Sequence, residues 1–282
     1  MRTPFIACIL CLPVLGFGFQ EPVKDSVQSW SHTMVSALTF TQVSYSNWVQ
    51  GGQNSLAYTL SVEGKSERDD STLNWANSYK FAFGQARLGG GGLRKTDDKI
   101  DLQSVLTYKW GSLINPYVAA TLKSQFAEGV TYNDQGIATP VSAIFDPVYL
   151  TQSVGFGYQP VPQIKTRLGA ALREILTSMH TAYSDDPGTA EIEKTKVDGG
   201  IESVTEIEWK LEENILLTAK LELFAPLKNF DQVVVRGDNT LALKVSKYIV
   251  VNLNVQWINE TQVTPRTQVK ETLAIGLSYT LL

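Results

Sequence analysis

The stretch that decides the fold is Glu206-Ile207-Glu208-Trp209-Lys210-Leu211, in which charged and apolar side chains alternate without exception. Successive side chains of a β-strand point to opposite faces, so this stretch predicts a strand with one charged and one apolar face. The alternation begins near Gly199 and, after a short break at residues 212–214, resumes over residues 215–224. Two such runs joined by so short a connection predict a pair of antiparallel strands.

The same alternation recurs along the whole chain. It predicts about twelve strands, at residues 34–44, 54–63, 73–83, 99–110, 116–126, 148–158, 163–175, 199–211, 215–224, 232–245, 248–258 and 268–282. Residues 170–180 could form a short helix, but Gly169 and the flanking alternation favour a strand followed by a loop. We therefore expect an all-β chain.

The expected connections are alternately long and short. Residues 128–147 and 179–198 form long connections, whereas residues 111–115 and 159–162 form short ones, and only residues 64–72 depart from the rule. Antiparallel strands place odd and even connections at opposite ends of a sheet. One end of this sheet is therefore expected to have short turns and the other end long loops. Short periplasmic turns and long external loops are typical of a transmembrane antiparallel β-barrel.

Aromatic side chains support this prediction. They lie at strand ends on the apolar faces, where they suit a membrane–water interface: Trp75, Trp110, Tyr158, Trp209 and Tyr279 at the short-turn end, and Trp257 at the other. In lipid every backbone amide must be paired, so a sheet can span a membrane only when it closes on itself. The alternatives are a soluble β-sandwich and a lipocalin-like barrel, whose apolar faces point inward. Eight strands suffice for a lipocalin, and this chain is too long for one.

The first residues predict export. A positive start at Met1-Arg2, an apolar run over residues 5–15 and small residues before a cleavage point after Gly18 indicate a signal peptide at residues 1–18. A lead of residues 19–31 and a barrel of residues 32–282 would follow. A transmembrane anchor is the alternative, but the apolar run is short. Both cysteines lie in this signal peptide, so we expect a mature chain without disulfides in the outer membrane of a Gram-negative bacterium.

Short motifs carry a family resemblance. They are Asn47-Trp48-Val49-Gln50-Gly51-Gly52-Gln53-Asn54-Ser55-Leu56, Arg94–Asp101, Leu122–Phe126, Asp146–Leu150 and Lys244–Ile249. With them the chain resembles the DUF3078 family of uncharacterised outer-membrane β-barrel proteins from Bacteroidota-like bacteria. The resemblance implies a location and a barrel of unassigned function. The chain departs from common outer-membrane barrels in ending on leucine instead of an aromatic residue.

The polar faces predict a lumen lined by charges of both signs. The expected lumen-lining residues are Glu63, Lys80, Asp101, Lys123, Lys165, Arg167, Glu202, Glu206, Glu208, Lys220, Glu222, Arg236 and Lys244. Such a lining favours a small-solute channel or transporter-like pore that selects by size and charge. The alternative is a salt-bridged, hydrated interior that mainly holds the shape of the barrel. Acidic residues are concentrated on the eighth predicted strand, and basic residues on the fifth and seventh. An electric field across the lumen is therefore one alternative that the sequence leaves open.

Composition and side-chain chemistry argue against other classes. The net charge is -4, from 24 basic and 28 acidic residues, and so indicates no nucleic-acid partner. The two histidines, His32 and His180, offer no hydrolytic dyad, so we expect no enzyme. Asp97-Asp98 and Asp185-Asp186 could offer oxygen ligands to Ca²⁺, but adjacent loop carboxylates are ordinarily solvated. We expect neither metal nor cofactor.

The predicted external loops supply a second hypothesis for function. A non-conducting barrel could dock a partner protein or a surface glycan through them. Trp48, in the glycine-rich motif at residues 47–52, is the candidate contact residue, unless it packs inside the loops. An open lumen would favour the channel, whereas a lumen plugged by residues 128–147 or 179–198 would favour the scaffold. Outer-membrane lipid is the one partner common to both.

Overall fold

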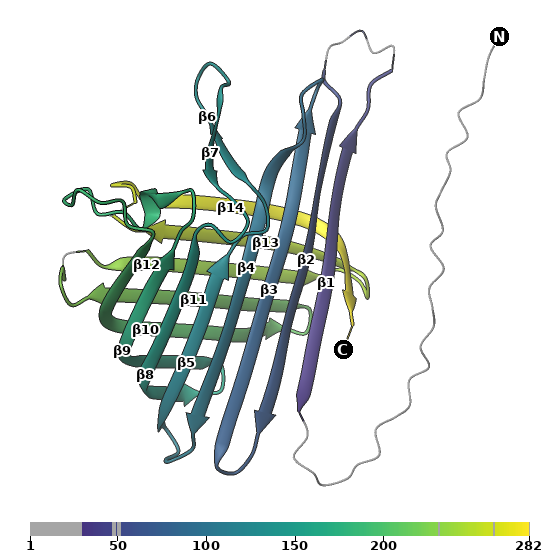
Figure 1. Cartoon of the computed structure of the whole chain (residues 1–282). Coiled ribbons are helices and arrows are strands. Elements are labelled where there is room, and N and C mark those ends of the chain that lie inside the picture. The colour runs from purple at the N-terminus through teal and green to yellow at the C-terminus, as the bar shows by residue number, and fades with distance from the viewer. Residues whose placement is uncertain (1–29, 47–48, 50–51, 231, 262, 282) are drawn as a thin grey trace.

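The computed structural model describes residues 30–46, 49, 52–230, 232–261 and 263–281. Twelve strands in this part of the chain close into an antiparallel barrel, in the order β1-β14-β13-β12-β11-β10-β9-β8-β5-β4-β3-β2 (Figure 1). The predicted signal peptide lies outside the described residues. The strands are β1 (Ser31–Val43), β2 (Ser55–Asp69), β3 (Leu73–Leu88), β4 (Arg94–Tyr108), β5 (Ile114–Ser124), β8 (Val148–Val161), β9 (Ile164–Leu176), β10 (Thr195–Glu212), β11 (Ile215–Pro226), β12 (Val234–Lys244), β13 (Ile249–Asn259) and β14 (Gln268–Thr280).

The two faces of the wall differ as the alternation predicts. Leu168 and Ile275 point outward and are 59% and 66% exposed, whereas Tyr117 and Val204 point inward and are 2% and 1% exposed. A barrel that turns its apolar side chains outward is stable only where lipid covers them. The predicted transmembrane barrel is therefore confirmed. No helix among the described residues is long and apolar enough to cross a membrane.

Two connections are shorter than the sequence pattern predicts. β2 continues to Asp69, so residues 64–72 reduce to a turn at residues 70–72 and no longer depart from the rule. β3 and β4 extend in the same way and leave a loop of only residues 89–93. Apolar alternation fades where charged side chains such as Lys65 and Glu67 enter, but backbone pairing with β1 and β3 continues there.

The long connections gather at one end of the barrel (Figure 1). The segment between β5 and β8 contains a hairpin of its own, β6 (Gly129–Tyr132) paired with β7 (Ala138–Ser142), which the sequence pattern does not predict. The segment between β9 and β10 contains one 3-10 turn, η1 (Thr181–Tyr183). Residues 170–176 belong to β9, so the preference for a strand over a helix is confirmed.

A pair of glycines brings β8 and β9 into close contact. Gly155 and Gly169 face each other in register, and a Cβ atom at Gly169 would lie 2.3 Å from the Val154 carbonyl oxygen and 2.7 Å from the Tyr117 hydroxyl. We expect Gly169→Ala to cost about 1–3 kcal/mol through overpacking and to lower the temperature at which the folded band disappears in unboiled SDS–PAGE. The control is Gly199→Ala on β10, where a Cβ atom meets open space. Equal losses in both variants would contradict the packing argument.

Candidate functional site

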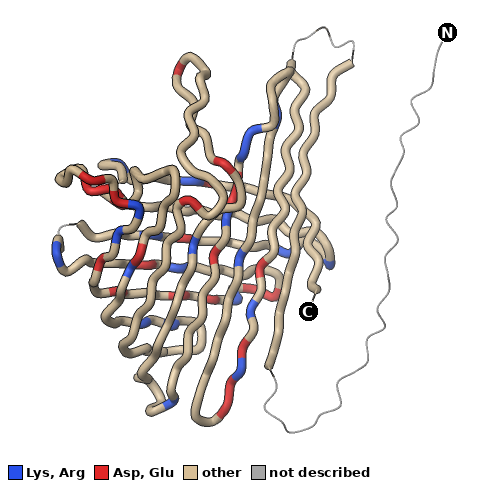
Figure 2. Tube along the Cα trace, viewed as in Figure 1, with Lys and Arg blue, Asp and Glu red and all other residues tan. Residues whose placement is uncertain are grey.

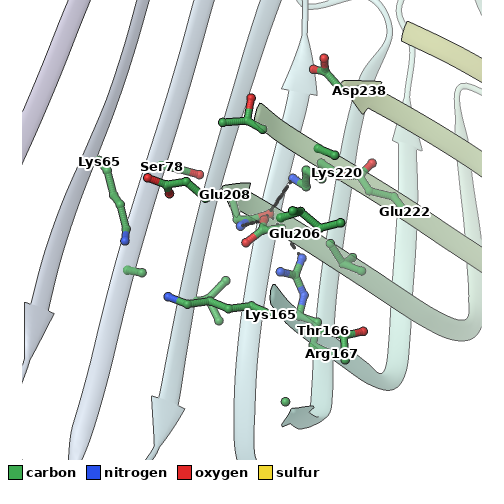
Figure 3. A pocket seen from close by; sticks show the side chains of 18 of the residues that line it. Lys65, Ser78, Lys165, Thr166, Arg167, Glu206, Glu208, Lys220, Glu222 and Asp238 are labelled. Atoms are coloured by element: carbon green, nitrogen blue, oxygen red, sulfur yellow. Dashed lines mark hydrogen bonds and ion pairs between the residues drawn. The ribbon is translucent and has the colours of Figure 1, made fainter. Parts of the chain in front are cut away.

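The lumen contains a cavity of about 770 Å³ (Figure 3). Its lining includes Leu113, Pro162 and Gln163, which lie in the short turns, so the cavity reaches the rim at that end. None of its lining residues comes from residues 128–147 or 179–198, so the two long connections do not plug it. Lys65 on β2 and Lys165 on β9 extend toward the same open space (Figure 3).

The structure places most of the expected lumen residues at this cavity. Those in its lining are Lys80, Asp101, Lys123, Lys165, Arg167, Glu206, Glu208, Lys220, Glu222 and Arg236. Glu202 lines a smaller hollow next to it, together with Lys123, Glu222 and Arg236. Glu63 lies on β2 with its carboxylate 4.0 Å from the Lys80 ammonium. Lys244 lies outside both linings, at the exposed end of β12.

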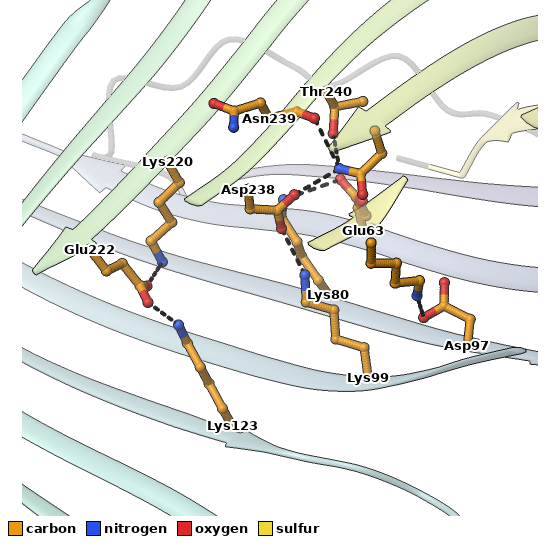
Figure 4. A network of polar contacts seen from close by, with 12 residues as sticks. Glu63, Lys80, Asp97, Lys99, Lys123, Lys220, Glu222, Asp238, Asn239 and Thr240 are labelled. Atoms are coloured by element: carbon orange, nitrogen blue, oxygen red, sulfur yellow. Dashed lines mark hydrogen bonds and ion pairs between the residues drawn. The ribbon is translucent and has the colours of Figure 1, made fainter. Parts of the chain in front are cut away.

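A group of side chains from four strands crosses the lumen and forms part of the wall of the cavity. Glu222 of β11 binds the Lys123 ammonium of β5 on one side and the Lys220 ammonium on the other, the latter at 2.9 Å (Figure 4). Lys220 also donates to the Oε1 of Gln103 at 2.8 Å, and the Gln103 amide donates to Glu206 at 2.9 Å. We call Lys123, Glu222, Lys220, Gln103 and Glu206 the septum. It narrows the lumen with side chains instead of a chain segment.

A second contact spans the full width of the barrel. Lys99 of β4 and Asp238 of β12 are six positions apart in the ring of twelve strands, yet their charged groups lie 2.7 Å apart (Figure 4). Asn254 holds the other Asp238 oxygen with a hydrogen bond of 2.7 Å. Lys99 was not among the residues expected to line the lumen, although it lies two positions from Asp101 in the same alternation. The sequence pattern missed Lys99 because it is the first residue of the predicted strand, where the alternation begins.

A third group lies at the end of the lumen toward the long loops. Glu260, 3% exposed, accepts hydrogen bonds from Arg173 at 2.6 Å and from Arg236 at 2.9 Å, and both guanidinium groups lie over the Tyr149 ring. Burial alone would raise the pKa of Glu260. The positive charges of Arg236 and Arg173 have the larger combined effect, so the pKa of Glu260 is lowered. The sequence pattern missed Glu260, because it follows the last residue of β13.

The acidic strand lies beside one of the two basic strands. Glu206 of β10 pairs directly with Lys165 of β9, whereas β5, the other basic strand, is three positions from β10 in the ring. The cavity lining has nine basic and five acidic side chains, and four of the basic ones take acidic partners beyond the lining. These pairs are Lys65–Glu67, Lys80–Glu63, Arg167–Glu202 and Arg236–Glu260. The lumen is therefore close to neutral, with its charges intermixed along the strands (Figure 2).

The carboxylates considered for Ca²⁺ are engaged by the chain itself. Asp97 binds Lys270 at 2.6 Å, and Asp98 accepts the backbone N–H groups of Phe126 and Ala127. Asp185 and Asp186 accept backbone N–H groups within their own loop. In the described part of the chain, no group of three or more His, Cys, Asp or Glu side chains is arranged to hold a metal ion.

The remaining predicted residues lie as follows. Trp75, Trp110, Tyr158, Trp209 and Tyr279 are exposed near the short-turn rim, at 43–75% of their surface. Trp257 is half-buried at the other end of the wall, packed over Gly237. His32 lies in β1, where its Nδ1 is 2.8 Å from the Ser66 hydroxyl. Trp48 lies outside the described residues.

Asp146 links the two long connections of the barrel. Its carboxylate, in a residue that is 2% exposed, accepts the backbone N–H groups of Ser178, Met179 and His180. Burial works to raise the pKa of Asp146, but these three donors outweigh it and lower the pKa. Because the pKa is lowered, the carboxylate stabilises the loops fully at any pH above 3.8, the ordinary pKa of an aspartate. This contribution is lost as the pH falls below that value.

We expect Asp146→Ala to release the segment between β9 and β10. Removing the acceptor leaves three backbone donors without their partner, at a cost of about 1–3 kcal/mol. Limited proteolysis of the protein in detergent should then cut residues 177–194 faster than in the wild type. Asp134→Ala, at an exposed position of the β6–β7 loop, is the control. Wild-type resistance in the Asp146 variant would show that other contacts hold this segment.

The chain matches two families of unknown function. Residues 40–130 match the family described as "Protein of unknown function (DUF3078)". Residues 149–281 match the family described as "Protein of unknown function, DUF481". The predicted resemblance to DUF3078 is confirmed over the first of these ranges, whereas the assignment to Bacteroidota-like bacteria stays a prediction. No curated protein matches the chain.

Solved structures with a similar fold share little sequence with it. An outer membrane channel from Pseudomonas putida F1 is 11% identical, with 94% of this chain and 99% of that chain covered and a TM-score of 0.40. The NanC porin is 9% identical, with 88% of this chain and 100% of that chain covered and a TM-score of 0.38. The translocator domain of autotransporter NalP from Neisseria meningitidis is 10% identical, with 89% of this chain and 86% of that chain covered and a TM-score of 0.37.

Proposed function

We propose that this chain, a transmembrane barrel of twelve strands, is an outer-membrane channel for small solutes. The observation that carries the proposal is the cavity of about 770 Å³ in the lumen, which no described chain segment plugs. Eight-stranded barrels are filled by their side chains, and barrels of 16–18 strands leave a wide aqueous channel. Twelve strands lie between these limits, so side chains can narrow such a lumen without filling it. The predicted signal peptide supports the outer membrane as the location.

The septum determines what passes. Its ion pairs leave room only for a solute that can move between charged side chains, which favours small polar molecules over large ones. Because the acidic and basic groups of the lumen are close to balanced, the passage discriminates weakly between cations and anions. Selectivity therefore depends on size and on local contacts with the septum. No step of this function requires a metal, a cofactor or a catalytic residue.

Single-channel recording of the refolded mature protein in a planar lipid bilayer tests the proposal. We expect small, stable current steps with a permeability ratio of cation to anion near one. Reversing the charge at Lys123 or at Glu206 should shift that ratio, toward cations in the first case and toward anions in the second. A folded barrel that inserts and passes no current would contradict the channel. It would instead favour a scaffold that docks a protein or a glycan through its external loops.

A further inference from the structure

The seam that closes the barrel is paired over only part of its length. β1 and β14 share five register pairs, from Val35–Thr280 to Thr39–Gly276, whereas β1 and β2 share thirteen. Beyond these pairs, residues 40–43 of β1 and residues 268–275 of β14 pair only with their other neighbours among the described residues. The half of the seam toward the long loops is therefore open, and Figure 1 shows the two strands diverging there.

The open half of the seam lies at the depth of the membrane. On the outward face, Tyr279 marks one end of β14, and Trp257 of β13 pairs with Val269 near the other end. Interfacial aromatic residues delimit the apolar band of a barrel. The band on β14 then covers residues 269–279, the length of about 9–11 residues that a tilted strand needs to span. Val269, Leu273 and Ile275, which are 61–72% exposed, lie inside it, and Glu271 faces outward between the first two.

An unpaired strand edge within lipid is costly, and such an edge is tolerated only where it is buried in protein or borders a water-filled cavity. Gly276 marks the point where the seam opens, as the last β14 residue paired with β1, and a Cβ atom there would lie 2.8 Å from the Leu38 carbonyl oxygen. The strands separate beyond it. The open edge thus connects the lumen with the lipid on the loop side of the barrel.

The inner wall beside the opening lacks the charges of the opposite wall. The inward positions of β1, β2 and β14 next to it are small or neutral: Thr39, Thr41, Ala57, Thr59, Thr272, Ala274 and Gly276. One ion pair crosses behind them, from Lys270 of β14 to Asp97 of β4 at 2.6 Å. A molecule leaving the lumen here would meet one polar contact at the inner side and the apolar side chains of Phe40 and Ile275 at the outer side, while the polar Gln42 and Glu271 face outward nearer the long loops.

We propose that the open half of the β1–β14 seam is a lateral portal between the lumen and the outer leaflet of the membrane. It admits an amphipathic solute with a small polar end and an apolar body. The polar end is held at the Lys270–Asp97 pair, while the apolar body passes between Phe40 and Ile275. The portal rests on the barrel lying in an outer membrane, as proposed above, but it does not require conduction along the barrel axis.

Two cysteine pairs test whether the seam is open. The only cysteines, Cys8 and Cys11, lie in the predicted signal peptide, so the mature protein has no competing thiol. Ala37 and Ser278 are register partners, and a seam zipped along the same register would bring Thr41 opposite Ala274. A disulfide forms only between Cα atoms closer than about 7 Å. We expect A37C/S278C to oxidise and T41C/A274C to stay reduced. Oxidation of both pairs to the same extent would overturn the portal.

Uptake of N-phenyl-1-naphthylamine, a neutral aromatic dye, tests passage through the seam. A Gram-negative host that produces T41C/A274C should take up the dye several-fold faster than cells without the barrel. A bismaleimide that links the two cysteines should reduce uptake to the background rate, whereas the same reagent on A37C/S278C should change nothing. Uptake at the background rate before cross-linking, or uptake that survives it, would overturn the portal. Bilayer conductance of the cross-linked protein separates this outcome from failure of the axial channel.

Discussion

Replacing Glu222 by alanine is expected to raise the single-channel conductance several-fold and to make the channel anion-selective. Glu222 is the central acceptor of the septum, since it binds both Lys123 and Lys220. Without it the two ammonium groups repel each other and retract toward their strands, which widens the passage. Lys123 then has lost its acidic partner and Lys220 keeps only Glu206, at 3.9 Å, so the septum carries excess positive charge that attracts anions.

Planar bilayer recordings under a salt gradient measure both effects, as the step size and as the reversal potential. The matched control is Glu213→Ala, which removes the same charge from an exposed turn outside the lumen. It should leave both quantities at wild-type values. A second variant, Glu222→Gln, keeps the size of the side chain and should shift the selectivity with a smaller change in conductance. Wild-type conductance in the alanine variant would mean that the septum does not limit the current.

The septum shows how far a sequence can predict such a site. Period-2 alternation identifies which side chains face the lumen, because it depends only on the geometry of one strand. It therefore placed Lys123, Glu206 and Glu222 on the polar faces, where the structure has them. Which of them meet depends on the order and register of strands distant in sequence. Lys99 and Asp238 are 139 positions apart, and nothing local to either residue reveals the contact.

The strand ends were predicted less well, for a related reason. Alternation of apolar and polar residues reports on contact with lipid, and it ends where the wall leaves the apolar band. Backbone pairing continues past that point, as in the last residues of β2 and the first residues of β4. The partial seam between β1 and β14 is equally hidden, because the sequence of each strand describes only its own two faces. A pattern within one strand contains no information on whether its neighbour is present.

Glu260→Ala is expected to destabilise the barrel by about 3–5 kcal/mol, the cost of removing one partner from a buried ion pair. Arg173 and Arg236 would lose their shared carboxylate, and the Arg173 side chain is only 7% exposed. The temperature at which the folded band disappears in unboiled SDS–PAGE should fall clearly. Glu191→Ala, at an exposed loop position, is the control and should remain near the wild type. Equal stability of the two variants would contradict the role of this cluster.

The pH dependence of the Glu260 variant gives a second, independent test. The pKa of Glu260 is lowered by its two arginines, so its stabilising contribution is complete above the ordinary value of 4.5 and declines as the pH falls below it. The alanine variant has no such contribution to lose. The difference in stability between wild type and variant should therefore be constant near neutral pH and shrink in acid. A cavity left by the shorter side chain would instead produce a difference that does not depend on pH, so this measurement separates lost charge pairing from lost packing.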